Sequence, residues 1–298
     1  MSFKSGFIAL IGAPNVGKST LLNALLGQKI SIVSSRPQTT RNRILGVKHV
    51  KGGQLIFLDT PGVLEPKGLL NKSLIQISLK SLAEVDLICL LIEPFSARTS
   101  LPENLRFRLS KTKVPIFLII NKIDLIDKKK LLPLMEQSSQ VLPFQEIIPV
   151  SALTGAGLEE LEKSLFQNLP EGPPFFPEDM VTDLTEKFLA GEIIREKVFR
   201  LISQEIPYGV AVTVESFKPR EDKPLIDIQA TIHVERESQK GILIGKQGRM
   251  LKAIGQQARE GMEALLGTKV FLELWVRVEK EWSKDPKFLR KFGYNEEG

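Results

Sequence analysis

Residues 12–20 read GAPNVGKST, a glycine-rich loop that follows an apolar run and opens a predicted helix. The loop matches G-x-x-x-x-G-K-[ST], with Gly12, Gly17, Lys18 and Ser19 at the fixed positions. Glycines let backbone N–H groups surround a phosphate at a helix N-terminus, where the helix dipole favours anions. We therefore expect a P-loop in which Lys18 reaches the β- and γ-phosphates and the Ser19 hydroxyl ligates Mg²⁺. The flanking strand and helix argue against a chance glycine turn.

Short apolar runs alternate with helical stretches through residues 1–169, the pattern of an α/β domain with a mainly parallel sheet. The predicted buried strands cover residues 7–12, 54–59, 86–92, 115–120 and 146–150. Residues 43–50 run through a glycine turn into the second of these strands, so we expect an antiparallel hairpin at that point.

A proline-rich stretch, LPEGPPFFPEDM at residues 169–180, interrupts this pattern. Its prolines prevent a continuous helix and favour an extended, semi-rigid connector. We therefore assign residues 1–169 to a nucleotide-binding domain, 170–180 to a linker and 181–298 to a second domain. The second domain has the predicted order helix, two strands, helix, glycine loop, helix, strand. This is a small α+β unit, which a polar tail follows.

The composition of the 298 residues restricts the setting in which the protein works. The single cysteine, Cys89, lies in an apolar run and cannot form an internal disulfide, which favours a reducing, cytoplasmic environment. We expect neither a targeting nor a membrane-spanning segment. Residues 1–179 carry 21 Lys and Arg against 16 Asp and Glu, whereas residues 180–298 carry 20 against 19. The second part is thus nearly neutral, so an argument for nucleic-acid binding needs local clusters of charge.

Further nucleotide-binding motifs follow the P-loop in order. LDTPG at residues 58–62 ends a strand, where Asp59 could hold Mg²⁺ through water and the Gly62 amide could touch the γ-phosphate. IINKID at residues 119–124 identifies the base, because Asp124 can accept hydrogen bonds from the N1–H and 2-amino groups of guanine. Adenine lacks these donors, and a carboxylate left without a partner would reject it.

These ordered motifs resemble those of translation-factor-class GTPases. In this resemblance Asn121 ties the base loop to the P-loop, and SAL at residues 151–153 places backbone amides on the guanine oxygen. RPQTTR at residues 36–41 supplies a switch threonine for the Mg²⁺ shell, which is Thr40, with Thr39 as the near alternative. The expected nucleotide contacts are Gly12, Ala13, Pro14, Asn15, Val16, Gly17, Lys18, Ser19, Thr20, Asp59, Thr60, Pro61, Gly62, Asn121, Lys122, Asp124, Ser151, Ala152 and Leu153.

The expected catalytic groups are Lys18, Thr40 and Asn15. Val63 follows the glycine at the position where Ras-like enzymes carry a water-orienting glutamine, so we expect slow intrinsic hydrolysis. Asn15 occupies the position that resembles the potassium ligand of cation-activated GTPases. A K⁺ ion held there could neutralise charge that develops between the phosphates. The alternative is that Asn15 only stabilises the loop by hydrogen bonding.

The second glycine loop, IGKQGRM at residues 244–250, cannot be another P-loop because no hydroxyl follows Lys246. It reads as a G-x-x-G turn between two helices, like the loop that lies against a nucleotide backbone in KH domains. A basic stripe surrounds it, and Ile242, Ile244 and Ile254 could line a groove for bases. The alternative is a helix C-cap beside a solvated stripe. The expected RNA contacts are Arg236, Lys240, Gly245, Lys246, Gln247, Gly248, Arg249 and Lys252.

Over essentially its whole length the chain resembles the Era-like family of bacterial GTPases. The stretches FPEDMVTD (176–183), EIIREK (192–197), VERESQKGILIGKQG (234–248) and LELWVRV (272–278) carry the likeness. The resemblance implies a Ras-like P-loop domain followed by a type II KH domain. It also implies GTP, GDP and Mg²⁺ as ligands, a monomeric state, and 16S rRNA near its 3′ end within the maturing 30S subunit as the partner.

Peripheral association with the inner membrane is implied by the family alone, since the sequence offers no anchor for it. Two functions other than ribosome assembly are compatible with parts of the sequence. A non-ribosomal RNA-binding regulator could use GTP as a structural ligand only, and turnover stimulated by 30S subunits would argue against that. An ATP-dependent kinase is disfavoured by the guanine-reading motif NKID.

Overall fold

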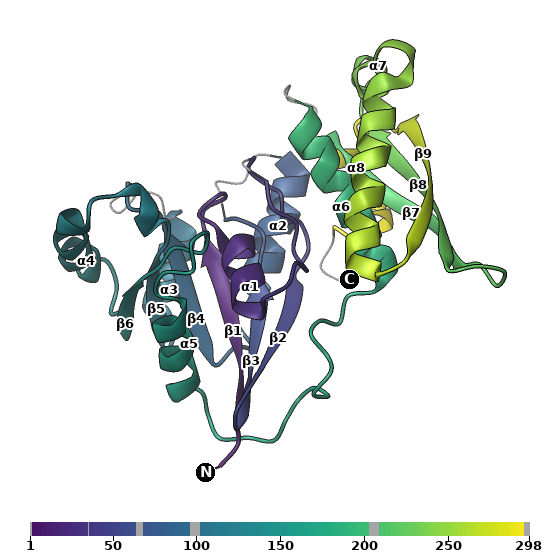
Figure 1. The fold of residues 1–298 in the computed structure, drawn as a ribbon. Coiled ribbons are helices and arrows are strands. Elements are labelled where there is room, and N and C mark those ends of the chain that lie inside the picture. Colours follow the sequence, from purple (N-terminus) through teal and green to yellow (C-terminus); the bar gives the residue numbers. More distant parts are fainter. Residues whose placement is uncertain (1, 35, 64–67, 96–101, 203–208, 295–298) are drawn as a thin grey trace. The chain divides into compact units, whose positions relative to one another are not determined.

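The first sheet has six strands in the order β2-β3-β1-β4-β5-β6, and all of its pairs are parallel except β2–β3 (Figure 1). The predicted mainly parallel sheet and its antiparallel hairpin are therefore confirmed. The computed structural model describes residues 2–34, 36–63, 68–95, 102–202 and 209–294. The strands are β1 (Lys4–Gly12), β2 (Ile44–Val50), β3 (Gly53–Asp59), β4 (Leu87–Ile92), β5 (Ile116–Ile120) and β6 (Glu146–Pro149).

Helices cover both faces of this sheet, because its central strands are apolar on both sides. The helices are α1 (Lys18–Leu26), α2 (Gly68–Lys80), α3 (Glu103–Lys111), α4 (Leu131–Ser139) and α5 (Leu158–Gln167). Side chains of α2 and α3 share one core cluster with the sheet, while α1 and α5 lie on the opposite face (Figure 1). The loops that leave the carboxyl ends of β1, β3 and β5 therefore meet at one edge of the sheet, where α/β folds bind ligands.

The proline-rich connector lies along the first unit and is bonded to it. The Ser5 amide donates to the carbonyl of Pro170 over 3.2 Å, and the Val47 amide on β2 donates to the carbonyl of Val181 over 2.7 Å. Between these points, the Gln54 side chain accepts from the Phe175 amide and donates to the carbonyl of Phe176. Contacts accordingly divide the chain between Asp183 and Leu184, so the connector packs as part of the first unit.

The second unit has the expected order of elements. Its sheet runs β7-β8-β9, with β7 antiparallel and β9 parallel to β8. Helices α6 and α8 pack on one face of this sheet around a second apolar core (Figure 1). The elements are α6 (Glu186–Leu201), β7 (Ala211–Pro219), β8 (Leu225–Val234), α7 (Glu237–Ile244), α8 (Arg249–Leu266) and β9 (Lys269–Val278), with the short 3₁₀ turn η4 (Lys246–Gly248) between α7 and α8.

The segment after β9, expected to be a polar tail, is instead packed on the second unit. It forms η5 (Trp282–Lys284) and α9 (Pro286–Lys291). The Trp282 side chain is fully buried and its indole N–H donates to the carbonyl of Gly209 over 2.9 Å. The Phe292 ring lies 4.7 Å from the ring of His233, and burial lowers the pKa of His233 to about 4. The sequence did not reveal this packing because the apolar residues of the segment are separated by charged residues. Residues 295–298, the end of that tail, lie outside the described residues.

No helix in the described part of the chain is both long enough and apolar enough to cross a membrane.

We predict that Gln54→Ala loosens the connector. Gln54 is buried, and its loss leaves the backbone groups of Phe175 and Phe176 without their partners. An unsatisfied buried polar group costs about 1–3 kcal/mol, so the unfolding free energy should fall by roughly that amount. Proteolysis between residues 170 and 183 should accelerate as well. The exposed Gln137→Ala on α4 is the control, and equal proteolysis of both variants would contradict the prediction.

Candidate nucleotide site and RNA-binding loop

The P-loop is fixed by two left-handed residues and by one side chain from the loop after β5. Asn15 and Gly17 have positive φ values of 65° and 96°, and α1 begins directly after Gly17. The Asn121 side chain donates from Nδ2 to the carbonyl of Val16 over 2.8 Å. A Cβ atom on Gly17 would lie 2.2 Å from that nitrogen, so only glycine fits there. The loop geometry thus depends on contacts with a distant strand.

Lys18 is buried within this loop. Its Nζ donates to the carbonyls of Gly12 and Ala13 over 3.2 and 3.0 Å. Burial lowers the pKa of Lys18 to about 8, and the negative charge of Asp59 opposes that shift. A bound phosphate would supply the counter-charge that the protein only partly provides. The site is therefore electrostatically prepared for an anion.

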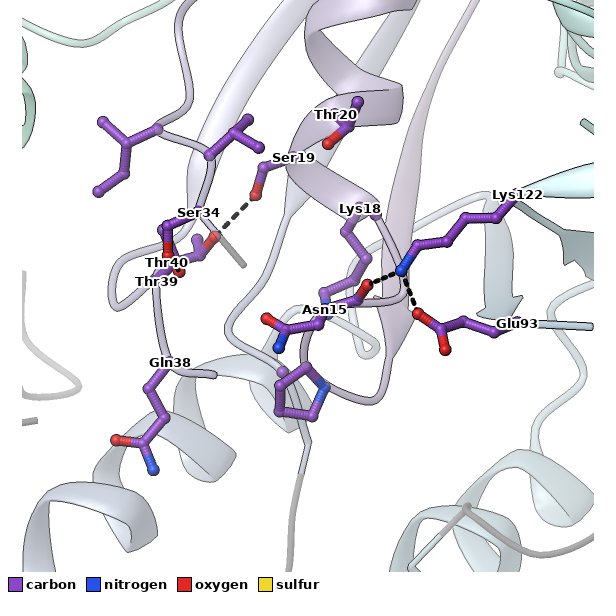
Figure 2. Close-up of a pocket in the computed structure, with 15 residues that line it drawn as sticks. Asn15, Lys18, Ser19, Thr20, Ser34, Gln38, Thr39, Thr40, Glu93 and Lys122 are labelled. Carbon is purple, nitrogen blue, oxygen red and sulfur yellow. Dashed lines mark hydrogen bonds and ion pairs between the residues drawn. The ribbon is translucent and has the colours of Figure 1, made fainter. Parts of the chain in front are cut away.

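Four oxygen-bearing side chains gather beside Lys18. The Ser19 hydroxyl donates to Asp59 over 2.6 Å. It also lies 2.8 Å from the Thr40 hydroxyl (Figure 2). The Ser31 hydroxyl donates to the same Asp59 oxygen over 3.0 Å. Burial raises the pKa of Asp59, although Lys18 and the neighbouring hydroxyls oppose the shift.

This cluster suits a hard divalent cation. The second oxygen of Asp59 is buried and lacks a hydrogen-bond partner within the described residues. Hydroxyl and carboxylate oxygens are the ligands that Mg²⁺ prefers. The Thr39 hydroxyl points elsewhere, donating to the carbonyl of Arg36 over 2.7 Å. The structure thus brings Thr40, rather than Thr39, beside Ser19 and Asp59.

A cavity of about 540 Å³ opens over the loop and is large enough for a nucleotide's phosphates and sugar. Its walls come from the P-loop, the segment before β2, and the loops after β3, β4 and β5 (Figure 2). Gly62 approaches the loop so closely that a Cβ atom would lie 2.7 Å from the Cα of Pro14. Pro14, Asn15, Gly17, Lys18, Ser19, Thr20, Thr40, Gly62 and Lys122 line it, among other residues.

Two of the expected nucleotide contacts, Thr60 and Pro61, form hydrogen bonds within the protein. The buried Thr60 hydroxyl donates to the carbonyl of Leu10 over 2.9 Å, and the carbonyl of Pro61 accepts from Ser78. Neither residue lines the cavity. Val63 is fully buried and its amide donates to the carbonyl of Gly12 over 3.1 Å, so its side chain does not face the phosphates.

The residues that we expect to read guanine form a connected group. The Ser151 hydroxyl donates to Asp124 over 2.5 Å, which orients the carboxylate. The Ala152 amide donates to the Asn121 side-chain oxygen over 3.0 Å, so Asn121 links this loop to the P-loop. Asp124 is exposed, and Leu153 projects outward with 80% of its surface accessible. A planar base could therefore enter between these loops.

Glu93 is a cavity residue that the sequence did not reveal. Lys122 Nζ donates to the backbone carbonyl of Asn15 over 2.7 Å and forms an ion pair with Glu93 (Figure 2). The pair joins the loop after β4 to the P-loop. Glu93 follows a buried strand without any local motif, so only the spatial arrangement identifies it.

The second glycine loop turns sharply between α7 and α8. Gly245, Gln247 and Gly248 all have positive φ values, of 69°, 54° and 74°. A Cβ atom on Gly245 would lie 2.8 Å from the Cβ of Met250. Lys246 and Arg249 are exposed beside the turn, and neither forms an ion pair within the described residues. The loop thus presents backbone and positive charge to solvent.

A groove of about 480 Å³ continues from this loop between α8 and β9. It corrects the expected apolar lining: Ile254 lies in the core at 0% exposure, and neither Ile242 nor Ile244 borders the groove. Lys240 lies on α7 and Arg236 caps the start of that helix, and neither residue lines the groove. The lining is Gly248, Leu251, Lys252, Gly255, Gln256, Arg259, Phe271, Leu272 and Leu274.

The fold and the two loops define a class of protein, a P-loop GTPase joined to a KH domain, and comparison with known families gives the same class. Residues 7–122 match the family described as 50S ribosome-binding GTPase, and residues 205–283 match the KH domain. GTPase Era of Geotalea uraniireducens is 53% identical over 98% of both chains. GTPase Era of Ruminiclostridium cellulolyticum is 51% identical over 99% of this chain and 98% of its own. The chain belongs to the Era family of GTPases.

Two solved structures share the whole fold. One is a variant of Aquifex aeolicus Era bound to GDP·AlF₄⁻, with 44% identity, a TM-score of 0.93, and coverage of 98% of this chain and 100% of that chain. The other is Era in complex with MgGDPNP and nucleotides 1506–1542 of 16S ribosomal RNA. It has 45% identity, a TM-score of 0.95, and coverage of 98% and 99%.

We predict that Asp124→Asn lowers guanine-nucleotide affinity by at least about 100-fold, because an amide cannot accept both guanine donors. Affinity for xanthosine diphosphate should rise, since xanthine offers an acceptor where guanine has its amino group. Titration with fluorescent nucleotides measures both. Asp127→Asn, a nearby residue whose carboxylate caps η2 (Lys128–Lys130), is the matched control. Unchanged GDP affinity in the Asp124 variant would refute the assignment.

Proposed function

We propose that this chain hydrolyses GTP, binds 16S rRNA near its 3′ end and assists maturation of the 30S subunit. The observation that carries the proposal is the joining, in one chain, of a guanine-reading P-loop domain and an exposed G-x-x-G loop with its groove. The relative solved with MgGDPNP and nucleotides 1506–1542 of 16S rRNA supports the choice of RNA, because it covers 98% of this chain. We place the protein in the cytoplasm, acting as a monomer.

In this proposal Ser19, Thr40 and Asp59 hold Mg²⁺, and the orphaned oxygen of Asp59 fits that role. The bound ion supplies charge neutralisation at the β- and γ-phosphates. Lys18 exchanges its bonds to the carbonyls of Gly12 and Ala13 for phosphate oxygens. Asp124, Ser151 and Asn121 orient the base and so fix the triphosphate relative to the loop.

The hydrolytic step itself receives little help from side chains after Gly62. Val63 is buried and can neither orient water nor accept its proton, so the intrinsic rate should be slow. Asn15 lines the phosphate cavity with its side chain (Figure 2), at the position suited to a monovalent cation. We propose that K⁺ bound there replaces the missing positive charge.

Potassium should therefore stimulate GTP hydrolysis relative to sodium at equal ionic strength, and the stimulation should vanish in Asn15→Ala. A carbonyl oxygen on the amide is the ligand that the substitution removes. Single-turnover hydrolysis in KCl and NaCl measures the effect, with GDP affinity measured in parallel as a control for loop integrity. Equal rates in the two salts would leave Asn15 with a purely structural role.

Charge reversal at the second loop should weaken RNA binding. Lys246→Glu with Arg249→Glu places two acids where the RNA backbone is expected, which should lower affinity at least about ten-fold and flatten its salt dependence. GTP affinity should stay at the wild-type level. Lys287→Glu with Arg290→Glu on α9 changes the net charge equally and serves as the control. An unaltered salt slope in the loop variant would disprove the KH assignment.

We also propose that the nucleotide state is coupled to RNA binding through residues 34–41 and the connector. The switch segment leads into β2, and β2 is bonded to the connector at Val181 and Thr182 just before α6. A movement of residues 34–41 would therefore be transmitted through β2 and the connector to the start of the RNA-binding unit. RNA titrations with GDP and with a GTP analogue measure this coupling, which linkage requires to be reciprocal.

A further inference from the structure

Helices α6 and α8 pack on one face of the sheet of the second unit, and within the described residues the segment that contains α9 covers only one end of the other face. Alternate residues of β9 (Val270, Leu272, Leu274, Val276 and Val278) pack into the core under α6 and α8. The residues between them lie on the opposite face, because side chains alternate along a strand. Phe271 and Trp275 there expose 48% and 47% of their surfaces. Two large aromatic rings thus stand on the same side of an edge strand.

The two rings are separated by an acid that is itself held in place. Glu273 lies between them on β9 and accepts a hydrogen bond from Gln229 of β8 over 2.8 Å. Across the sheet, Phe271 pairs with Asp227, Glu273 with Gln229 and Trp275 with Thr231. The open face therefore carries the Phe271 ring, the Glu273 carboxylate and the Trp275 ring in a row along β9. Successive members of this row are about 6.6 Å apart along the strand.

Positive charge flanks this row at both ends. The Arg220 guanidinium lies 5.8 Å from the centre of the Phe271 ring and pairs with Asp227. Arg277 follows Trp275 on the same face of β9. The far end of the face is already covered, since the Phe292 ring packs at a tilt against His233, the residue that pairs with Arg277. The row from Phe271 to Trp275 is the part left exposed.

The row also continues the groove. Phe271 borders the cavity that begins at Gly248 of the second glycine loop, and it is also half-exposed on β9, the edge strand of the sheet. A KH groove holds about four nucleotides. The RNA in the complex of the Era relative, nucleotides 1506–1542, is much longer than that. RNA leaving the groove past Phe271 would reach the open face directly.

We propose that the open face of this sheet is a second binding surface for single-stranded RNA, in which bases stack on Phe271 and Trp275. Aromatic rings stack on any base, and the carboxylate of Glu273 accepts hydrogen bonds from exocyclic amino groups of cytosine, adenine or guanine. Arg220 and Arg277 contact the backbone on either side. This surface extends the RNA site of the proposed function and rests on it.

The test compares a long RNA with short ones. RNA of nucleotides 1506–1542 and tetranucleotides tiled across it are titrated against wild type, Trp275→Ala and Trp275→Phe. Trp275→Ala should weaken the long RNA roughly ten-fold, the loss of one stacked base, and leave the tetranucleotides unchanged. Trp275→Phe should retain most of the affinity. Leu265→Ala, which removes a similarly exposed apolar side chain from α8, is the matched control.

Fluorescence provides a second readout that a folding defect would not imitate. The chain has two tryptophans, and Trp282 is fully buried. The long RNA should quench wild-type emission, while Trp275→Phe, which retains only Trp282, should not respond.

The outcomes separate this proposal from the one on which it rests. If Trp275→Ala binds the long RNA like wild type while the double charge reversal at Lys246 and Arg249 weakens it, the open face is not an RNA surface and the loop assignment stands. If neither variant changes RNA binding, both proposals are wrong. If Trp275→Ala lost affinity equally for tetranucleotides and for the long RNA, Trp275 would act in the groove or in stabilising the fold, and the proposal of a second surface would be wrong. Normal RNA binding with lost 30S binding would indicate a protein partner for this face.

Discussion

The nucleotide site depends on the side chain of Asn121. One amide group donates to the P-loop at Val16 and accepts from the base loop at Ala152, while the Asn121 backbone amide bonds to the carbonyl of Ile92 at the end of β4. Three loops that are distant in sequence are thereby held in fixed positions relative to one another. Gly17 is required for the same reason, because any side chain there would collide with Asn121. The phosphate cradle and the base pocket are thus parts of one hydrogen-bonded assembly.

The buried charges of Lys18 and Asp59 in this assembly favour the ligand-bound state over the empty state. Burial lowers the pKa of Lys18 and raises that of Asp59, so each residue is less stable in its charged form than it would be in water. Their mutual attraction offsets only part of that cost. A phosphate beside Lys18 and a divalent cation beside Asp59 would supply the remainder, which explains why the sheet retains buried charges at this edge.

The two glycine-lysine loops use the same backbone property for different phosphates. In the first loop, Gly17 starts a buried helix N-terminus with a hydroxyl, Ser19, pointing at an acid. In the second, Gly245 and Gly248 flank a turn whose lysine is exposed and forms no ion pair within the part of the chain that the structure describes. The first loop is suited to enclosing a nucleotide and a metal, and we propose that the second lies against an RNA backbone that passes over the surface.

The sequence by itself determined most features that depend on neighbours along the chain, although it did not reveal the short helix α9. Apolar runs specified the parallel strands, and the fixed spacing in GAPNVGKST and IGKQGRM specified the two loops, because strand burial and glycine conformation are local properties. Tertiary structure alone decided which of Thr39 and Thr40 meets Ser19, and that Glu93 pairs with Lys122. It also decided that Leu272 and Leu274, not Ile254, line the groove, and that Trp282 is buried. These outcomes depend on contacts between distant segments, whose geometry no local pattern encodes.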